Sequence, residues 1–222
     1  MLTEPTPFDL RMHLFRIPIR VHPSFWLLGL LIGWDPEHPQ YMVICSLCIL
    51  FSILIHELGH ALTAEAFGWR SEIVLYLFGG LAFSERWAGR TPLKDIFVAA
   101  AGPAAQACLL PLLYATELIL AEYPAVGGNE YVLVAMQFLW FINIVWTILN
   151  LMPVLPLDGG QILLGILELC GLRDPLTPTL IVSIIIGGLL AWASFSMGTG
   201  GILFIFLTIS NVQTLQAHRA RW

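Results

Sequence analysis

Long apolar segments are the feature that most constrains what this chain can fold into. A transmembrane helix needs about 20 apolar residues, and three of the segments clearly reach that length. The other three are at or below it, and the full set is residues 21–34, 41–67, 96–120, 131–153, 177–196 and 201–216. We therefore predict an all-α polytopic membrane protein with about six transmembrane helices, formed by residues 1–222 as a single domain.

The distribution of charge agrees with six crossings. All ten Lys and Arg residues then fall on one side of the membrane, and the loops on the other side carry none. Because positively charged loops stay in the cytoplasm, we expect both termini to be cytoplasmic. The short loops favour a prokaryotic cytoplasmic membrane, and the net charge of −5 gives no reason to expect a nucleic-acid partner.

Two further segments do not have the length or pattern of a span. Residues 71–84 are rich in β-branched and aromatic residues and are interrupted by Gly79 and Gly80, which predicts a small β-hairpin or strand at the cytoplasmic membrane face. Residues 159–170 are typical of a short helix on the same side. The glycine-containing stretch 197–201 predicts a tight turn between the last two spans.

A metal-binding motif lies inside the second apolar segment. His56, Glu57 and His60 form the pattern HExxH, and in a helix the two histidines lie one turn apart on the same face. Both imidazoles can then bind one zinc ion, while Glu57 can accept a proton from a water molecule. Ionisable residues in a spanning helix are costly unless they are paired or functional, which favours a metal site over a chance match.

A third ligand is needed, because a catalytic zinc ion usually has three protein ligands and one open position. Asp158 is the candidate, since it follows the fourth apolar segment in the stretch NLMPVLPLDGGQI, where prolines and glycines interrupt the helix. The alternative is that Asp158 is the N-cap of the short helix that follows. The two roles are compatible.

These two motifs, in this order and topology, resemble the site-2 protease family of intramembrane zinc metalloproteases. The segments FGGLA (78–82) and AAAGP (99–103) are also similar to that family, as is the spacing of Asn143 and Asn150. The resemblance covers about residues 17–170, whereas the last two helices, within 177–216, carry no diagnostic motif. The chain resembles the minimal branch of the family, which has no PDZ or CBS domains.

The resemblance implies one Zn²⁺ per chain, held by His56, His60 and Asp158, with Glu57 as the catalytic base. The substrate it implies is a transmembrane segment of another protein, cut within the bilayer. Residues expected to contact that substrate are Asn150, Asn143, Gly79, Gly80 and Gln106.

Two further expectations about substrate contacts concern Gln106 and the predicted strand. Gln106 stands where the family more usually has asparagine, which leaves its contact with substrate or water open. Residues 73–83 could supply a strand edge to which an extended substrate adds as a further strand. Surrounding membrane lipid and, as an open alternative, a second copy in a homo-oligomer are the other partners considered.

Two other functions compete with proteolysis. A metal-ion transporter could also use intramembrane histidine and aspartate, although it would not need Glu57 between the histidines. A catalytically silent relative could act only as a membrane-binding partner. Exchange of Glu57 for glutamine separates these functions, because only a protease loses turnover while it keeps its zinc.

Overall fold

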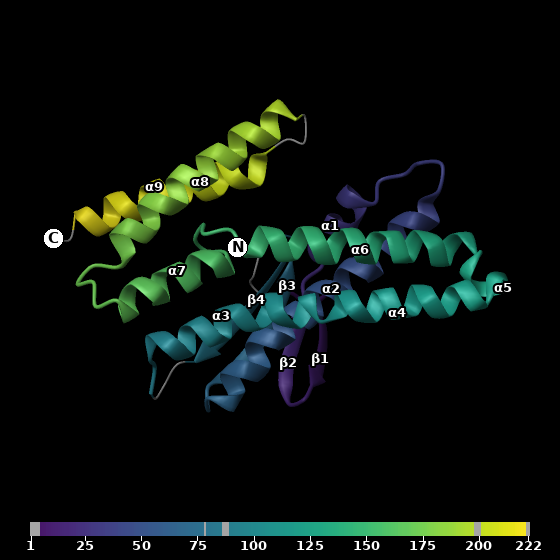
Figure 1. Ribbon diagram of the computed structural model, residues 1–222, viewed down its shortest axis with the longest axis horizontal. Helices are drawn as coiled ribbons and strands as arrows, with labels where there is room; N and C mark the ends of the chain where they lie inside the picture. The colour runs from purple at the N-terminus through teal and green to yellow at the C-terminus, as the bar shows by residue number, and fades with distance from the viewer. Residues whose placement is uncertain (1–4, 78, 86–88, 198–200, 221–222) are drawn as a thin grey trace. The chain divides into compact units, whose positions relative to one another are not determined.

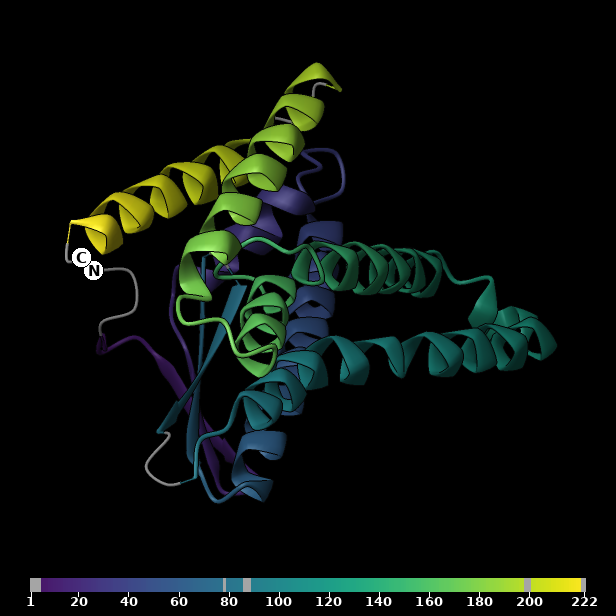
Figure 2. The same ribbon diagram turned by 60° about the vertical axis from the view of Figure 1, so that its left-hand side comes forward.

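The computed structural model describes residues 5–77, 79–85, 89–197 and 201–220. The chain divides into two compact units, which the ribbon diagrams of Figures 1 and 2 show in sequence colours. The first unit comprises Met1–Gly89 and Ala101–Thr147, and the second comprises Arg90–Ala100 and Ile148–Trp222. The expectation that the whole chain is one domain stays a prediction.

A four-stranded sheet belongs to the first unit. Its strands are β1 (Leu10–Leu14), β2 (Ile17–Val21), β3 (Arg70–Tyr76) and β4 (Gly79–Glu85), in the order β1-β2-β3-β4. The central pair β2 and β3 is parallel, and the two outer pairs are antiparallel. The hairpin expected within residues 71–84 is therefore present as β3 and β4, and the predicted helical fold with a small β element is confirmed in part, since the sheet has two further strands.

Strands β1 and β2 were not predicted because their turn lacks the usual glycine. Phe15 and Arg16 form this two-residue turn with positive φ angles of 48° and 70°, a conformation that favours Asn-Gly or Gly. The strands themselves carry a signal, since side chains along β2 alternate between buried and half-buried. Its buried side chains face the core that holds the sheet to the helices.

Helix α2 (Pro39–Ala66) packs against β3 and β4. Its residues at spacings of three and four are buried, among them Cys45, Ile49, Ile53 and His56, so one stripe of the helix faces the core. Ile19 of β2 and Ile73 of β3 pack in the same cluster. The two histidines of the HExxH motif therefore lie on the packed face of α2.

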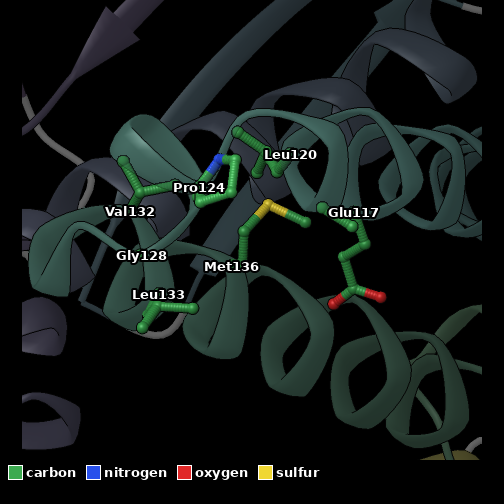
Figure 3. Close-up of a pocket in the computed structure, with 9 residues that line it drawn as sticks. Glu117, Leu120, Pro124, Gly128, Val132, Leu133 and Met136 are labelled. Atoms are coloured by element: carbon green, nitrogen blue, oxygen red, sulfur yellow. The ribbon is translucent and has the colours of Figure 1, made fainter.

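The first unit also contains a long helical hairpin. The last residues of α3 (Pro92–Ala107) lead into α4 (Leu109–Glu122), and the short α5 (Pro124–Gly127) connects α4 to α6 (Glu130–Asn150). Figures 1 and 2 both show α4 and α6 running side by side. Near α5 they enclose a mainly apolar pocket of about 400 Å³, into which Figure 3 shows Glu117 and Met136 projecting.

The second unit is helical in the part that the structure describes. It contains the start of α3 and the helices α7 (Asp158–Leu169), α8 (Leu176–Ser196) and α9 (Ile202–Arg219), of which α8 and α9 pack together. Helix α7 confirms the short helix predicted for residues 159–170. Residues 198–200 of the predicted turn lie outside the described residues, as does Phe78 of the FGGLA segment.

Among the described residues, four helical segments are long and apolar enough to cross a membrane: α2, α3 with α4, α6 and α8. Helix α1 (Phe25–Ile32), in the first predicted span, has 8 residues and would extend only about 12 Å, against a hydrocarbon core of about 30 Å. Helix α9 is not one of the four. The prediction of six spans is therefore not confirmed.

Candidate metal centre

The two histidines of α2 point their Nε2 atoms at each other from within the core of the first unit. His56 and His60 are 2% and 8% exposed, and their Nε2 atoms are 3.1 Å apart. Two nitrogens bound to one zinc ion at tetrahedral geometry, with bonds of about 2.0–2.1 Å, would be about 3.3 Å apart. The spacing of this pair therefore fits a zinc ion with little adjustment.

Gln106 of α3 holds the imidazole of His56. Its Oε1 atom lies 3.1 Å from His56 Nδ1, and the Gln106 side chain is completely buried. An amide oxygen can only accept, so His56 donates from Nδ1, and its Nε2 carries no proton and can act as a metal ligand. Thr147 of α6 donates to the same oxygen over 3.2 Å.

His60 depends on the absence of a side chain at Gly102 of α3. A Cβ atom at this glycine would lie 2.2 Å from His60 Nε2, closer than atoms can approach without displacement. The imidazole therefore occupies space that any larger residue at position 102 would take. Gly102 belongs to the AAAGP segment, so this contact gives that motif a physical role.

Glu57 lies beside the histidine pair and is 5% exposed. The backbone of β4 comes so close to it that a Cβ atom at Gly80 would lie 2.4 Å from Glu57 Oε1. Desolvation and, after it, the negative charge of Glu57 raise the pKa of Tyr76 at the end of β3. The carboxylate is thus enclosed by α2 and by the β3–β4 hairpin.

Asp158 is the first residue of α7 in the second unit. The N-cap position is occupied by Leu157, which makes no side-chain capping hydrogen bond, so the alternative of Asp158 as the N-cap is wrong. A carboxylate in the first turn is still favoured by the helix dipole. Because Asp158 belongs to the other unit, its role as the third ligand beside His56 and His60 stays a prediction.

The residues expected to contact substrate occupy different environments. Asn143 of α6 is completely buried and donates from Nδ2 to Ser52 Oγ over 3.0 Å. Asn150, near the end of α6, is half-buried. Gly79 has a φ of 116°, and a Cβ atom there would lie 2.6 Å from the ring of Trp146. Whether any of them contacts a substrate stays a prediction.

Two buried polar atoms near this site have no hydrogen-bond partner in the described part of the chain. They are Nε2 of Gln106 and Oδ1 of Asn143. Most buried polar groups are paired, so each of these atoms remains available to a water molecule or a ligand. The sequence suggested neither Thr147 nor Ser52, although each hydroxyl lies in an apolar span where a polar residue needs a partner.

A comparison of the sequence with models of protein families identifies the family of this chain. The model of peptidase family M50 matches residues 44–132 and 126–194. The chain belongs to peptidase family M50, the site-2 proteases. The matched segments include HExxH and Asp158, and they extend into α8, beyond the part of the chain in which motifs could be recognised.

Curated relatives of this M50 chain have names of the same kind. A protein of Synechocystis sp. named as a candidate zinc metalloprotease is 33% identical over 207 residues, which are 86% of this chain and 52% of that protein. Stage IV sporulation protein FB of Bacillus subtilis is 37% identical over 152 residues, covering 66% and 46% respectively. The chain thus spans about half the length of these relatives, and the absence of further domains stays a prediction.

A solved structure supports the fold of the M50 chain. The site-2 protease from Methanocaldococcus jannaschii superposes with a TM-score of 0.62 at 22% identity, covering 94% of this chain and 95% of that one. The family and the four apolar helices identify a membrane protein. The pocket of Figure 3 is lined by none of the residues of the candidate metal centre.

Proposed function

We propose that this chain is an intramembrane zinc metalloprotease, which hydrolyses peptide bonds within transmembrane segments of substrate proteins. The observation that carries the proposal is the convergence of His56 Nε2 and His60 Nε2 within 3.1 Å on the buried face of a helix long enough to span the membrane. Glu57, between them in sequence, supplies a carboxylate that a binding site alone would not need.

The proposed cofactor is one Zn²⁺ per chain, with His56, His60 and Asp158 as ligands. Two neutral imidazoles and a carboxylate are a donor set that zinc commonly takes in catalytic sites. The 3.1 Å spacing of the imidazole nitrogens supports the histidine pair, and the family match over the segment that contains Asp158 supports the third ligand. A zinc ion bound there supplies Lewis-acid chemistry and lowers the pKa of a bound water molecule.

The residues of the chain have separate tasks in this reaction. Glu57 accepts the proton of the attacking water and then donates it to the leaving amine. Gln106 keeps His56 in the tautomer whose Nε2 carries no proton. The burial of all three HExxH side chains limits access of bulk water, which strengthens the electrostatic interactions among them.

The substrate must present an extended segment, since a peptide bond inside a helix is shielded by its own hydrogen bonds. Strand β4 is at one end of the sheet order, so it could accept such a segment by strand addition. Gly79 and Gly80 begin this strand, and Asn150, Asn143 and Gln106 are the proposed polar contacts. A Gly79→Pro exchange should slow cleavage and leave zinc binding unchanged; an unchanged cleavage rate contradicts strand addition.

The test of the function uses the detergent-purified full chain. We would measure zinc content and the cleavage of a reporter with one apolar 20-residue span between two soluble tags. Glu57→Gln should abolish cleavage and keep one zinc per chain, whereas Asp158→Ala should lose or sharply weaken zinc. Equal zinc content in wild type and Asp158→Ala contradicts the proposed ligand set.

The competing functions give different results in the same experiment. A metal-ion transporter reconstituted in vesicles would keep its zinc flux in Glu57→Gln. A catalytically silent relative would bind the reporter without cutting it in wild type and variant alike. The cytoplasmic placement of both termini, the prokaryotic membrane and a homo-oligomeric state remain proposals alongside the function.

A further inference from the structure

The loop before Asp158 is held from outside at Leu155, through both of its backbone polar groups. This loop connects α6 to α7 and has no regular secondary structure, so backbone groups that its own turns do not pair need partners from elsewhere. In an apolar environment an unpaired peptide group is costly, and irregular backbone persists only where protein groups satisfy it.

Side chains from both helices of the α8–α9 pair satisfy Leu155. Its N–H donates to Ser183 Oγ of α8 over 2.9 Å, and its carbonyl oxygen accepts from Asn211 Nδ2 of α9 over 2.7 Å. The Ser183 and Asn211 side chains come from segments where the sequence shows no family motif. They are 28 positions apart in the sequence, and they bond the two peptide groups on either side of the same residue.

Each of these side chains is also fixed on its own helix. Ser183 Oγ donates to the carbonyl oxygen of Thr179 over 2.8 Å, and Asn211 Nδ2 donates to that of Leu207 over 2.8 Å. Ser183 is completely buried and Asn211 is 4% exposed. Their rotamers are therefore set before they contact the loop, as a positioning role requires.

A short and compact path leads from Leu155 to Asp158. Leu157 N–H donates back to the carbonyl oxygen of Val154 over 2.8 Å, which closes a turn, and Val154 is completely buried. Asp158 then begins α7. The backbone of Leu155 therefore lies within a hydrogen-bonded turn that directly precedes Asp158.

We propose that Ser183 and Asn211 are positioning residues of the metal centre, which hold the Asp158 carboxylate in place through the backbone N–H and carbonyl group of Leu155. The inference rests on the proposed function of Asp158 as a zinc ligand. It makes the α8–α9 pair part of the catalytic apparatus rather than a membrane anchor alone.

Two matched controls separate positioning from general helix stability. Thr179 is a completely buried hydroxyl on α8 that donates over 2.7 Å to Pro175, and Thr208 on α9 donates over 2.7 Å to Phe204. Phe204 lies in the same helix as Thr208, and Pro175 is the N-cap of the helix that contains Thr179, so neither hydrogen bond reaches another element. Thr179→Val and Thr208→Val therefore perturb α8 and α9 and leave the side chains that bind Leu155 in place.

The experiment measures zinc dissociation constants of the full detergent-purified chain by competition with a chromophoric chelator. The same variants are loaded with Co²⁺, whose visible absorption reports ligand geometry. Ser183→Ala and Asn211→Leu should each weaken zinc binding by about tenfold and change the Co²⁺ spectrum, in the range seen when outer partners of metal ligands are removed. Thr179→Val and Thr208→Val should do neither, and Ser183→Thr, which retains the hydroxyl, should restore the wild-type constant.

The outcomes distinguish this inference from the function on which it rests. In one outcome, Asp158→Ala loses zinc, whereas Ser183→Ala is folded by circular dichroism and binds zinc and Co²⁺ as wild type does. This outcome refutes the positioning role and leaves the proposed function standing. If Asp158→Ala itself binds zinc as wild type does, both are refuted. Because Ser183→Ala removes one atom from a helix and suits helical structure, it remains decisive even where Asn211→Leu does not fold.

Discussion

Gln106→Leu is the exchange that tests most directly how the histidine pair is prepared for metal. It removes an oxygen that lies 3.1 Å from His56 Nδ1 and leaves that N–H buried in an apolar surrounding. His56 can then move its proton to Nε2, which makes the ligand nitrogen a donor and removes it from the metal.

The size of the effect can be worked out in two ways. A lost hydrogen bond of about 0.5–1.5 kcal/mol, together with the stranding of a buried donor at about 1–3 kcal/mol, gives about 1.5–4.5 kcal/mol as an upper range. Removal of a group that hydrogen-bonds to a metal-bound histidine weakens metal binding by about 10- to 100-fold, which corresponds to about 1.4–2.7 kcal/mol. We therefore expect zinc binding to weaken by about 10- to 100-fold.

The assay is chelator competition on the purified chain, with Thr147→Val as the matched control. Thr147 donates to the same oxygen over 3.2 Å, so its loss leaves the acceptor of His56 in place. We expect the zinc dissociation constant of the control to change by less than about threefold. A single neutral hydrogen bond contributes about 0.5–1.5 kcal/mol, and this one mostly stabilises the position of the Gln106 side chain rather than the bound metal. A folded Gln106→Leu protein with a zinc constant within threefold of wild type would refute the reasoning.

Two further predictions concern a close approach and a pH dependence. Gly102→Ala should abolish zinc binding, because its Cβ atom would lie 2.2 Å from His60 Nε2. The control Gly188→Ala, whose Cβ atom would have nothing within 4 Å, should leave the zinc content unchanged. Mass spectrometry measures the zinc content of both variants, and a normal zinc content in Gly102→Ala would contradict the prediction. Desolvation tends to raise the pKa of Asp9, but hydrogen bonds from Thr6 and Arg20 outweigh it and lower that pKa to about 2, from an ordinary value of 3.8. The ionised carboxylate therefore stabilises the folded state fully above pH 4, and this contribution is lost as the pH falls through about 2. The melting temperature of Asp9→Asn should thus be lower than that of wild type at pH 5 and approach it at pH 2. A difference in melting temperature that does not change with pH would contradict the predicted direction of the pH dependence.

Local features were predicted well because short-range geometry fixes them. The HExxH pattern places His56 and His60 on one helix face, since residues four apart in a helix are neighbours whatever the rest of the chain does. The lengths of the apolar segments likewise predicted three clear spans, and each corresponds to one of the four long apolar helical segments in the described part of the chain. Segment 21–34 is shorter than a span, and only Phe25–Ile32 within it is helical, so a crossing there is not confirmed.

Partners in space were not predicted, because they depend on how separate elements pack. The sequence placed Gln106 among residues for substrate, but the packing of α3 on α2 puts its amide against His56, 50 positions away. The turn at Phe15–Arg16 lacks the glycine that marks such turns, so the first two strands appear only when β2 pairs with β3.

The sequence by itself therefore determined the long apolar helices, the histidine pair and the family. The tertiary structure decided which groups hold those histidines and the loop before Asp158. Ser183 and Asn211 illustrate the physical reason, since a polar residue in an apolar helix signals that a partner must exist but cannot name it. Only the packed helices show that both side chains bond the backbone of Leu155.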